Sequence, residues 1–81
     1  MNTQLVDSAP PGDFEEISIG TDTPKWMNRF EGLVQEGKRI KYQVSDMPIL
    51  PESIRRELNR SGYCDHILRN TDQHFLVPKS H

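Results

Sequence analysis

The stretch TPKWMNRFEGLVQEGKRIKYQVS, residues 23–45, decides the fold because a helix pattern is followed at once by a strand pattern. In its first half, large apolar residues recur every three or four positions, so that Trp26, Phe30 and Val34 share one face of a helix. A threonine and a proline suit the first turn, and Gly37 suits the left-handed residue just past the end. The spacing therefore predicts an amphipathic helix with one buried face.

The second half of this stretch, RIKYQVS, alternates apolar and polar residues. Ile40 and Tyr42 fall on one side of a strand, and Lys41 and Gln43 fall on the other side. A strand with this alternation has one face on the core and one face toward solvent, and here the solvent face is basic.

Shorter patterns flank this unit on both sides. FEEISIG, residues 14–20, predicts a short strand before the helix, and PESIRRELNRSG, residues 51–62, predicts a second helix with Ile54 and Leu58 inward. The runs YCDHILR and HFLVP are separated by the turn formers NTDQ, which indicates a final β-hairpin.

Together these segments predict one small α+β domain of order β-α-β-α-β-β, with two helices packed on a small, largely antiparallel sheet that ends in the hairpin. The predicted core consists of inward-facing apolar residues: Trp26, Phe30, Leu33, Ile40, Tyr42, Val44, Ile54, Leu58, Leu68, Phe75 and Val77.

Composition divides the 81 residues into three parts. Residues 1–13 are small and polar with a Pro-Pro-Gly breaker, and we expect a flexible acidic leader there; residues 14–78 form the domain, and residues 79–81 a mobile end. The first 24 residues carry five acidic residues and no Lys or Arg, whereas the rest of the chain has 10 basic and 7 acidic residues. An acidic leader beside a mildly basic body is either an electrostatic screen or an ordinary solvated segment.

The hairpin raises the question of a metal site, because it carries Cys64, His66 and His74. A loop centred between Thr71 and Asp72 would place His74 opposite Arg69 and away from the other two side chains, whereas a three-residue loop would bring all three to one face. Cys-x-His followed by a distant single His is not a usual zinc pattern, so we expect no metal and no other cofactor.

The sequence contains no motif that indicates catalysis. It has no Gly-rich phosphate loop, no GxSxG, no HExxH and no paired carboxylates, and we expect that the protein is not an enzyme. A single cysteine, no apolar run long enough to span a membrane and no signal-peptide pattern favour a cytoplasmic location.

Binding is therefore the expected activity, in the form of a small regulatory, adaptor or inhibitor protein that binds a larger protein stoichiometrically. Phe14, Arg56 and Tyr63 are the candidate anchors, because aromatic residues and Arg dominate such interfaces. The alternative is a DNA- or RNA-binding regulator resembling a reduced winged helix, which would use basic residues of the second helix and middle strand: Lys38, Arg39, Lys41, Arg55, Arg56 and Arg60. Either protein could be a monomer or a homodimer that pairs through an outer strand.

Overall fold

The computed structural model describes residues 2–19, 23–44 and 50–79. It contains a five-stranded sheet whose strand order is β1-β4-β5-β3-β2, and two helices. The elements in chain order are β1 (Asn2–Val6), β2 (Glu15–Ile19), α1 (Thr23–Gln35), β3 (Ile40–Val44), α2 (Glu52–Arg60), β4 (Cys64–Leu68) and β5 (Gln73–Val77).

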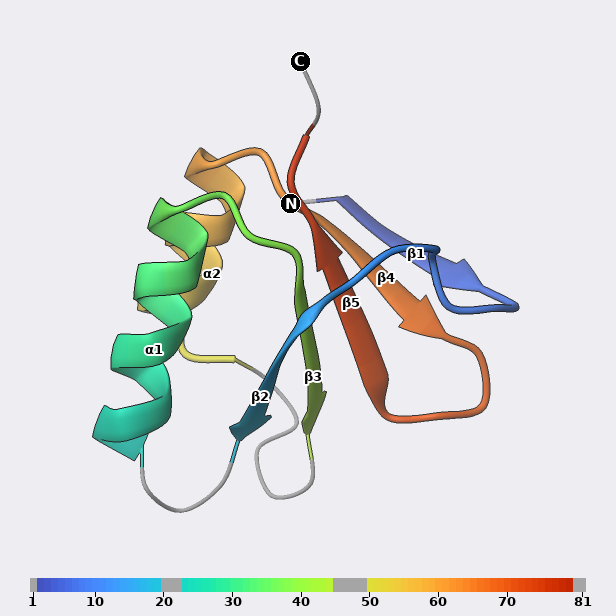
Figure 1. Cartoon of the computed structure of the whole chain (residues 1–81), viewed down its shortest axis with the longest axis horizontal. Helices are drawn as coiled ribbons and strands as arrows, with labels where there is room; N and C mark the ends of the chain where they lie inside the picture. The colour runs from blue at the N-terminus through green and yellow to red at the C-terminus, as the bar shows by residue number, and fades with distance from the viewer. Residues whose placement is uncertain (1, 20–22, 45–49, 80–81) are drawn as a thin grey trace.

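Both helices lie on one side of the sheet, and none of the described residues forms a helix on the other side (Figure 1). The α+β class is confirmed, as is the order β-α-β-α-β-β from β2 to β5. The sheet is mixed rather than largely antiparallel, because β2 pairs with β3 and β1 with β4 in parallel, while β5 pairs antiparallel with both β3 and β4. The physical reason is that the chain crosses the sheet through α1 between β2 and β3, and a crossover connection returns the chain in the same direction.

Within the predicted flexible leader, residues 2–13 are described by the structure, and part of this segment is a strand. Residues 2–6 form the edge strand β1 beside β4, and the following segment leads across the sheet to β2 at the opposite edge. Most side chains of β1 are exposed, so the sequence correctly indicated that this segment buries little. Its order comes instead from backbone hydrogen bonds to β4, which composition does not reveal.

The core lies between the helices and the sheet. Phe30, Ile40, Ile54 and Leu58, each at most 1% exposed, confirm the predicted inward faces of three elements. The full set of clustered core residues is Ile17, Ile19, Trp26, Phe30, Val34, Ile40, Tyr42, Leu50, Ile54, Leu58, Tyr63 and Leu76, with Met27 and Leu33 packed against it.

The predicted core is wrong for the hairpin. Leu76, not Phe75 or Val77, points toward the helices, because Leu76 pairs with the inward-facing Ile40. Phe75 is buried on the opposite side of the sheet, and Leu68 and Val77 are only half-buried. The prediction for the Val44 side chain lies outside the described part of the chain.

The end of α1 follows the predicted pattern. Gly37 has φ of +69°, and the amides of Gly37 and Lys38 donate to the carbonyls of Val34 and Leu33 at 3.0 Å each. These two bonds are the Schellman motif, which satisfies carbonyls that the helix leaves unpaired. Helix α2 ends with the same pair of bonds, so both helices stop where the sequence predicts.

Candidate functional site

The side of the sheet away from the helices, here called the open face, is defined by strand alternation. In β3, Tyr42 points to the core, so Lys41 and Gln43 point to the open face. The antiparallel register places Lys41 opposite Phe75 and Gln43 opposite Gln73. The outward residues of β3 and β5 therefore form one continuous surface.

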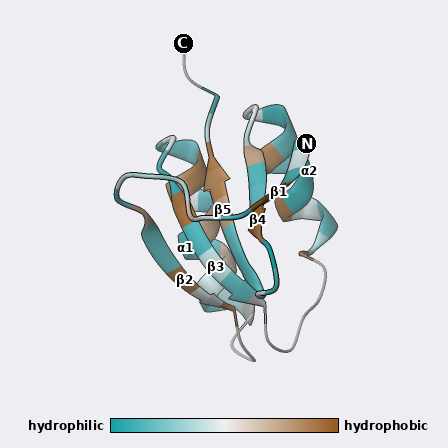
Figure 2. Cartoon of the chain, turned by 90° about the vertical axis from the view of Figure 1, so that its right-hand side faces the viewer, coloured by the Kyte–Doolittle hydropathy of each residue, from teal (hydrophilic) through white to brown (hydrophobic). Residues whose placement is uncertain are grey.

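One part of the open face is covered by the connection between β1 and β2, which crosses the strands on the side away from the helices (Figure 2). At its end, the Phe14 ring meets the Phe75 ring edge-on, with centroids 5.2 Å apart. The guanidinium of Arg39 lies 4.3 Å from the Phe14 centroid. Phe75 is consequently only 4% exposed, although it faces away from α1 and α2.

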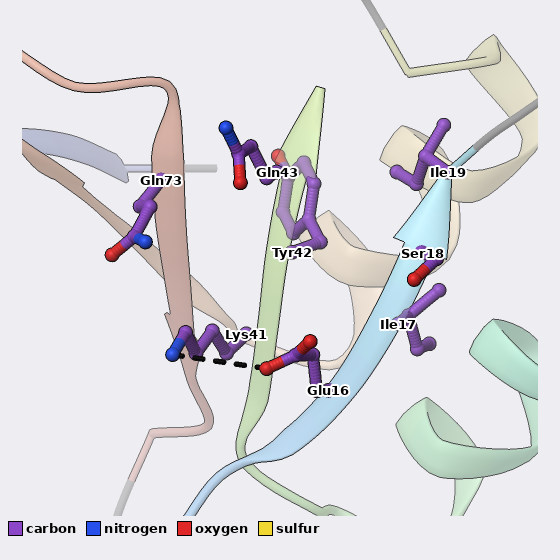
Figure 3. Close-up of a pocket in the computed structure, with 8 residues that line it drawn as sticks. All are labelled: Glu16, Ile17, Ser18, Ile19, Lys41, Tyr42, Gln43 and Gln73. Atoms are coloured by element: carbon purple, nitrogen blue, oxygen red, sulfur yellow. Dashed lines mark ion pairs between the residues drawn. The ribbon is translucent and has the colours of Figure 1, made fainter. Parts of the chain in front are cut away.

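The adjoining part of the open face has a hollow of about 320 Å³, lined by polar residues and by Ile17, Ile19 and Tyr42. Its polar lining comes from three neighbouring strands: Glu16 and Ser18 of β2, Lys41 and Gln43 of β3, and Gln73 of β5. Figure 3 shows Glu16 and Lys41 directed toward each other, with a carboxylate-to-Nζ distance of 3.8 Å. We call these five residues the open-face hollow.

The open-face hollow offers both hydrogen-bond donors and acceptors with little net charge. Its Lys41 and Glu16 charges compensate each other, and Lys41 Nζ also lies 6.0 Å from the Phe75 centroid. Ser18 and the two glutamine amides can each donate and accept. The alternation of β3 predicts from the sequence that Lys41 and Gln43 point outward. The position of Gln73 beside them is not predictable in this way, because it depends on the β3–β5 register.

The three predicted protein-binding anchors do not converge. Phe14 lies half-buried on the open face, whereas Arg56 is exposed on α2 and pairs with Glu52 at 3.3 Å, as their spacing indicates. Tyr63 is 3% exposed, and its hydroxyl donates to the Lys38 carbonyl at 2.6 Å. Tyr63 therefore holds the turn after α1 against the core, and burial raises the pKa of its hydroxyl.

The six predicted nucleic-acid-binding residues are also separated. Arg39 and Lys41 belong to the open face, while Arg55, Arg56 and Arg60 lie on α2, on the other side of the sheet. Arg60 pairs with Glu57. The sheet thus separates Arg39 and Lys41 from the three arginines of α2.

The hairpin register answers the metal question. His74 lies opposite Ile67, not Arg69, and the connecting loop is Arg69–Asp72. His74 therefore faces the helices, while Cys64 and His66 face the open side. A loop centred between Thr71 and Asp72 also predicts these faces, although it pairs His74 with a different residue. Among residues 2–19, 23–44 and 50–79, no three His, Cys, Asp or Glu side chains are grouped to hold a metal ion.

On its own side of the sheet, His74 belongs to a part-buried polar cluster. Its Nδ1 atom lies 3.0 Å from a carboxylate oxygen of Asp65 and 3.2 Å from the hydroxyl of Tyr42. The Tyr42 and His74 rings also stack with centroids 4.7 Å apart. Burial and the negative charge of Asp65 raise the pKa of the Tyr42 hydroxyl far above its ordinary value.

Comparison with known proteins found no matching family model, no similar curated protein and no similar solved structure. Neither α1 nor α2 of the described chain is long and apolar enough to cross a membrane.

Proposed function

We propose that the protein is a small non-enzymatic regulator, adaptor or inhibitor that binds stoichiometrically to a larger protein through the open-face hollow. The observation that carries this proposal is the convergence of five polar side chains from three strands on the helix-free side of the sheet. We further propose that it acts in the cytoplasm, on the basis of its single cysteine.

The residues around the hollow support a protein partner. A protein surface supplies both hydrogen-bond donors and acceptors, which can pair with the glutamine and serine side chains and with the compensated Glu16–Lys41 pair. Next to the hollow, the Arg39 guanidinium lies over the Phe14 ring, and both residue types are enriched in protein interfaces. The open face thus combines a polar area with an aromatic one.

The alternative, a DNA- or RNA-binding regulator, has weaker support. A nucleic-acid site needs several cations on one surface, because affinity comes largely from phosphate contacts. Here the basic residues lie on two sides of the sheet, and three of them pair with a carboxylate: Lys41 with Glu16, Arg56 with Glu52 and Arg60 with Glu57.

A photo-crosslinking residue at Gln43 tests the proposal. Gln43 is exposed in the hollow, and Gln35, exposed at the end of α1, provides the matched control position. We expect Gln43 alone to capture a specific protein from cell extract, and the purified pair to titrate to a fixed stoichiometry. Capture of nucleic acid, with binding that weakens steeply with salt, would favour the alternative, and equal capture from both positions would exclude the hollow as the interface.

A further inference from the structure

The outer edge of β1 has the features of a self-pairing surface. We propose that two copies of this chain form a symmetric dimer in which their β1 strands pair antiparallel, with Gln4 of each copy at the two-fold axis. The two sheets would then join into one continuous sheet. The dimer does not depend on the proposed function, because the open-face hollow lies at the β2–β3–β5 end of the sheet.

The backbone of β1 shows which groups face outward. The amide of Arg69 donates to the Val6 carbonyl at 2.8 Å, so Val6 directs its carbonyl toward the β4 side. Within a strand, the N-H and C=O of one residue point to the same side, and successive residues alternate. Gln4 therefore also faces β4, whereas Thr3 and Leu5 direct their N-H and C=O groups outward, where the described chain provides no partner strand.

Two-fold symmetry pairs all of these outward groups. With Gln4 on the axis, Thr3 of one copy lies opposite Leu5 of the other, and each such pair exchanges two backbone hydrogen bonds. The dimer therefore forms four bonds from the two amides and two carbonyls that each copy presents. No other antiparallel register about a two-fold axis within Asn2–Val6 pairs both Thr3 and Leu5 in this way.

The opposite edge of the sheet, strand β2, is protected against pairing with another strand. Strand β2 carries the charged residues Glu15 and Glu16, and Arg29 of α1 donates to the main-chain carbonyl of Glu16 and lies 3.8 Å from the Glu15 carboxylate. Charges and covering side chains are the usual protection of an edge strand. Strand β1, NTQLV, contains no charged residue and no proline, so the strand itself lacks these edge protections; the charges nearest to Thr3 are those of Glu52, Arg55 and Arg56 on α2.

Side chains add to the backbone pairing on both faces. Leu5 is 61% exposed and is the large hydrophobic residue that the described chain leaves most open. In the dimer it packs across Thr3 of the second copy and diagonally against the second Leu5. On the other face the two Gln4 amides meet at the axis. Because five-residue strands bury less than a standard interface, we expect dissociation constants of roughly 1–100 µM.

Analytical ultracentrifugation of the full chain up to about 300 µM tests the dimer, and Leu5→Pro is the sharpest variant. Proline removes the outward N-H of Leu5 and leaves the β4 ladder intact, so dimerisation should be lost while thermal stability changes little. Gln4→Pro is the matched control, because it removes an N-H that faces β4 and should lower stability. A monomer at all concentrations, or a Leu5→Pro protein that still dimerises, would overturn the proposal.

Cross-linking tests the register without relying on proline. In a Cys64→Ser background, Gln4→Cys should form an inter-chain disulfide readily, since residues 4 of the two copies face each other at a non-hydrogen-bonded site. Asn2→Cys should not, because residue 2 faces residue 6 of the second copy. Equal cross-linking of the two variants would overturn the proposed pairing, and failure of partner capture through Gln43 would leave this result unaffected.

Discussion

The imidazole of His74 and the carboxylate of Asp65 lie 3.0 Å apart on the helix side of the hairpin, as diagonal neighbours of adjacent strands. Asp65 is 5% exposed, so its charge is largely removed from water. A buried carboxylate is tolerated only when hydrogen-bonding or charged partners replace water, and His74 supplies that partner here. The pair therefore links the register of the hairpin to the stability of the core.

Replacing Asp65 by alanine should lower the free energy of unfolding by about 1–3 kcal/mol, because the part-buried imidazole loses its carboxylate partner and keeps only the Tyr42 hydroxyl. A double-mutant cycle with His74→Phe separates this interaction from simple loss of packing. Urea denaturation of the four proteins should give non-additive effects. Strict additivity of the two substitutions would show that the contact contributes nothing.

Alkaline pH should unfold the protein, and its two tyrosines should lose their protons as it unfolds rather than in the folded state. Both tyrosines of the chain, Tyr42 and Tyr63, have pKa values raised above 10.0 by burial. A raised folded-state pKa means that the unfolded chain releases these protons first, so the stabilisation is complete below pH 10 and declines as the pH rises beyond it. Absorbance at 295 nm and circular dichroism should change together.

Tyr42→Phe and Tyr63→Phe provide the controls for the alkaline transition. Each variant removes one hydroxyl whose pKa is raised in the folded protein. Above pH 10.0 its free energy of unfolding should therefore fall less steeply with pH than that of the parent protein. Tyrosinate absorbance that rises near pH 10 while the circular dichroism stays native would contradict the raised pKa values.

Local patterns were sufficient to predict both helices and the two faces of β3. The apolar spacing around Phe30 and the alternation of Tyr42 with Lys41 depend on residues close in sequence, and both patterns are confirmed. Local patterns did not determine which hairpin residues face the core, because the two faces depend on the length of the loop. A shift of one residue in the loop exchanges Phe75 and Leu76 between core and open face, and the predicted core contained the wrong one.

Pairings between distant segments were not predictable from one sequence. Strand β1 has too few apolar residues to be recognised as structured, and its order comes from backbone bonds to β4, about 60 residues later in the chain. The open-face hollow requires β2, β3 and β5 to be adjacent, which only the sheet topology provides. The alternation of β3 therefore predicts Lys41 and Gln43 on the outward face, but not the adjacent residues of β2 and β5.

Phe30 and Phe14 should differ sharply in their effect on stability. Phe30 is 0% exposed and contacts the rings of Trp26 and Tyr42, so Phe30→Ala should cost about 3–5 kcal/mol and risks unfolding so small a domain. Phe14 is half-buried on the open face, and Phe14→Ala should cost only about 1–2 kcal/mol. Thermal denaturation of both proteins measures the difference, and a near-parental Phe30→Ala would contradict the packing of α1.

Alanine substitution of the glycine inside α1 and of the glycine just past its end should change the stability of the protein in opposite directions. Gly32 lies inside α1, where a Cβ would meet nothing within 4 Å, so Gly32→Ala should stabilise the protein by about 0.5–1 kcal/mol through helix propensity alone. Gly37 is equally uncrowded but has φ of +69°, and Gly37→Ala should destabilise it by about 1–2 kcal/mol. Since neither substitution creates a contact, urea denaturation reports backbone conformation directly. Equal effects of the same sign would show that the chain does not adopt the left-handed conformation at Gly37.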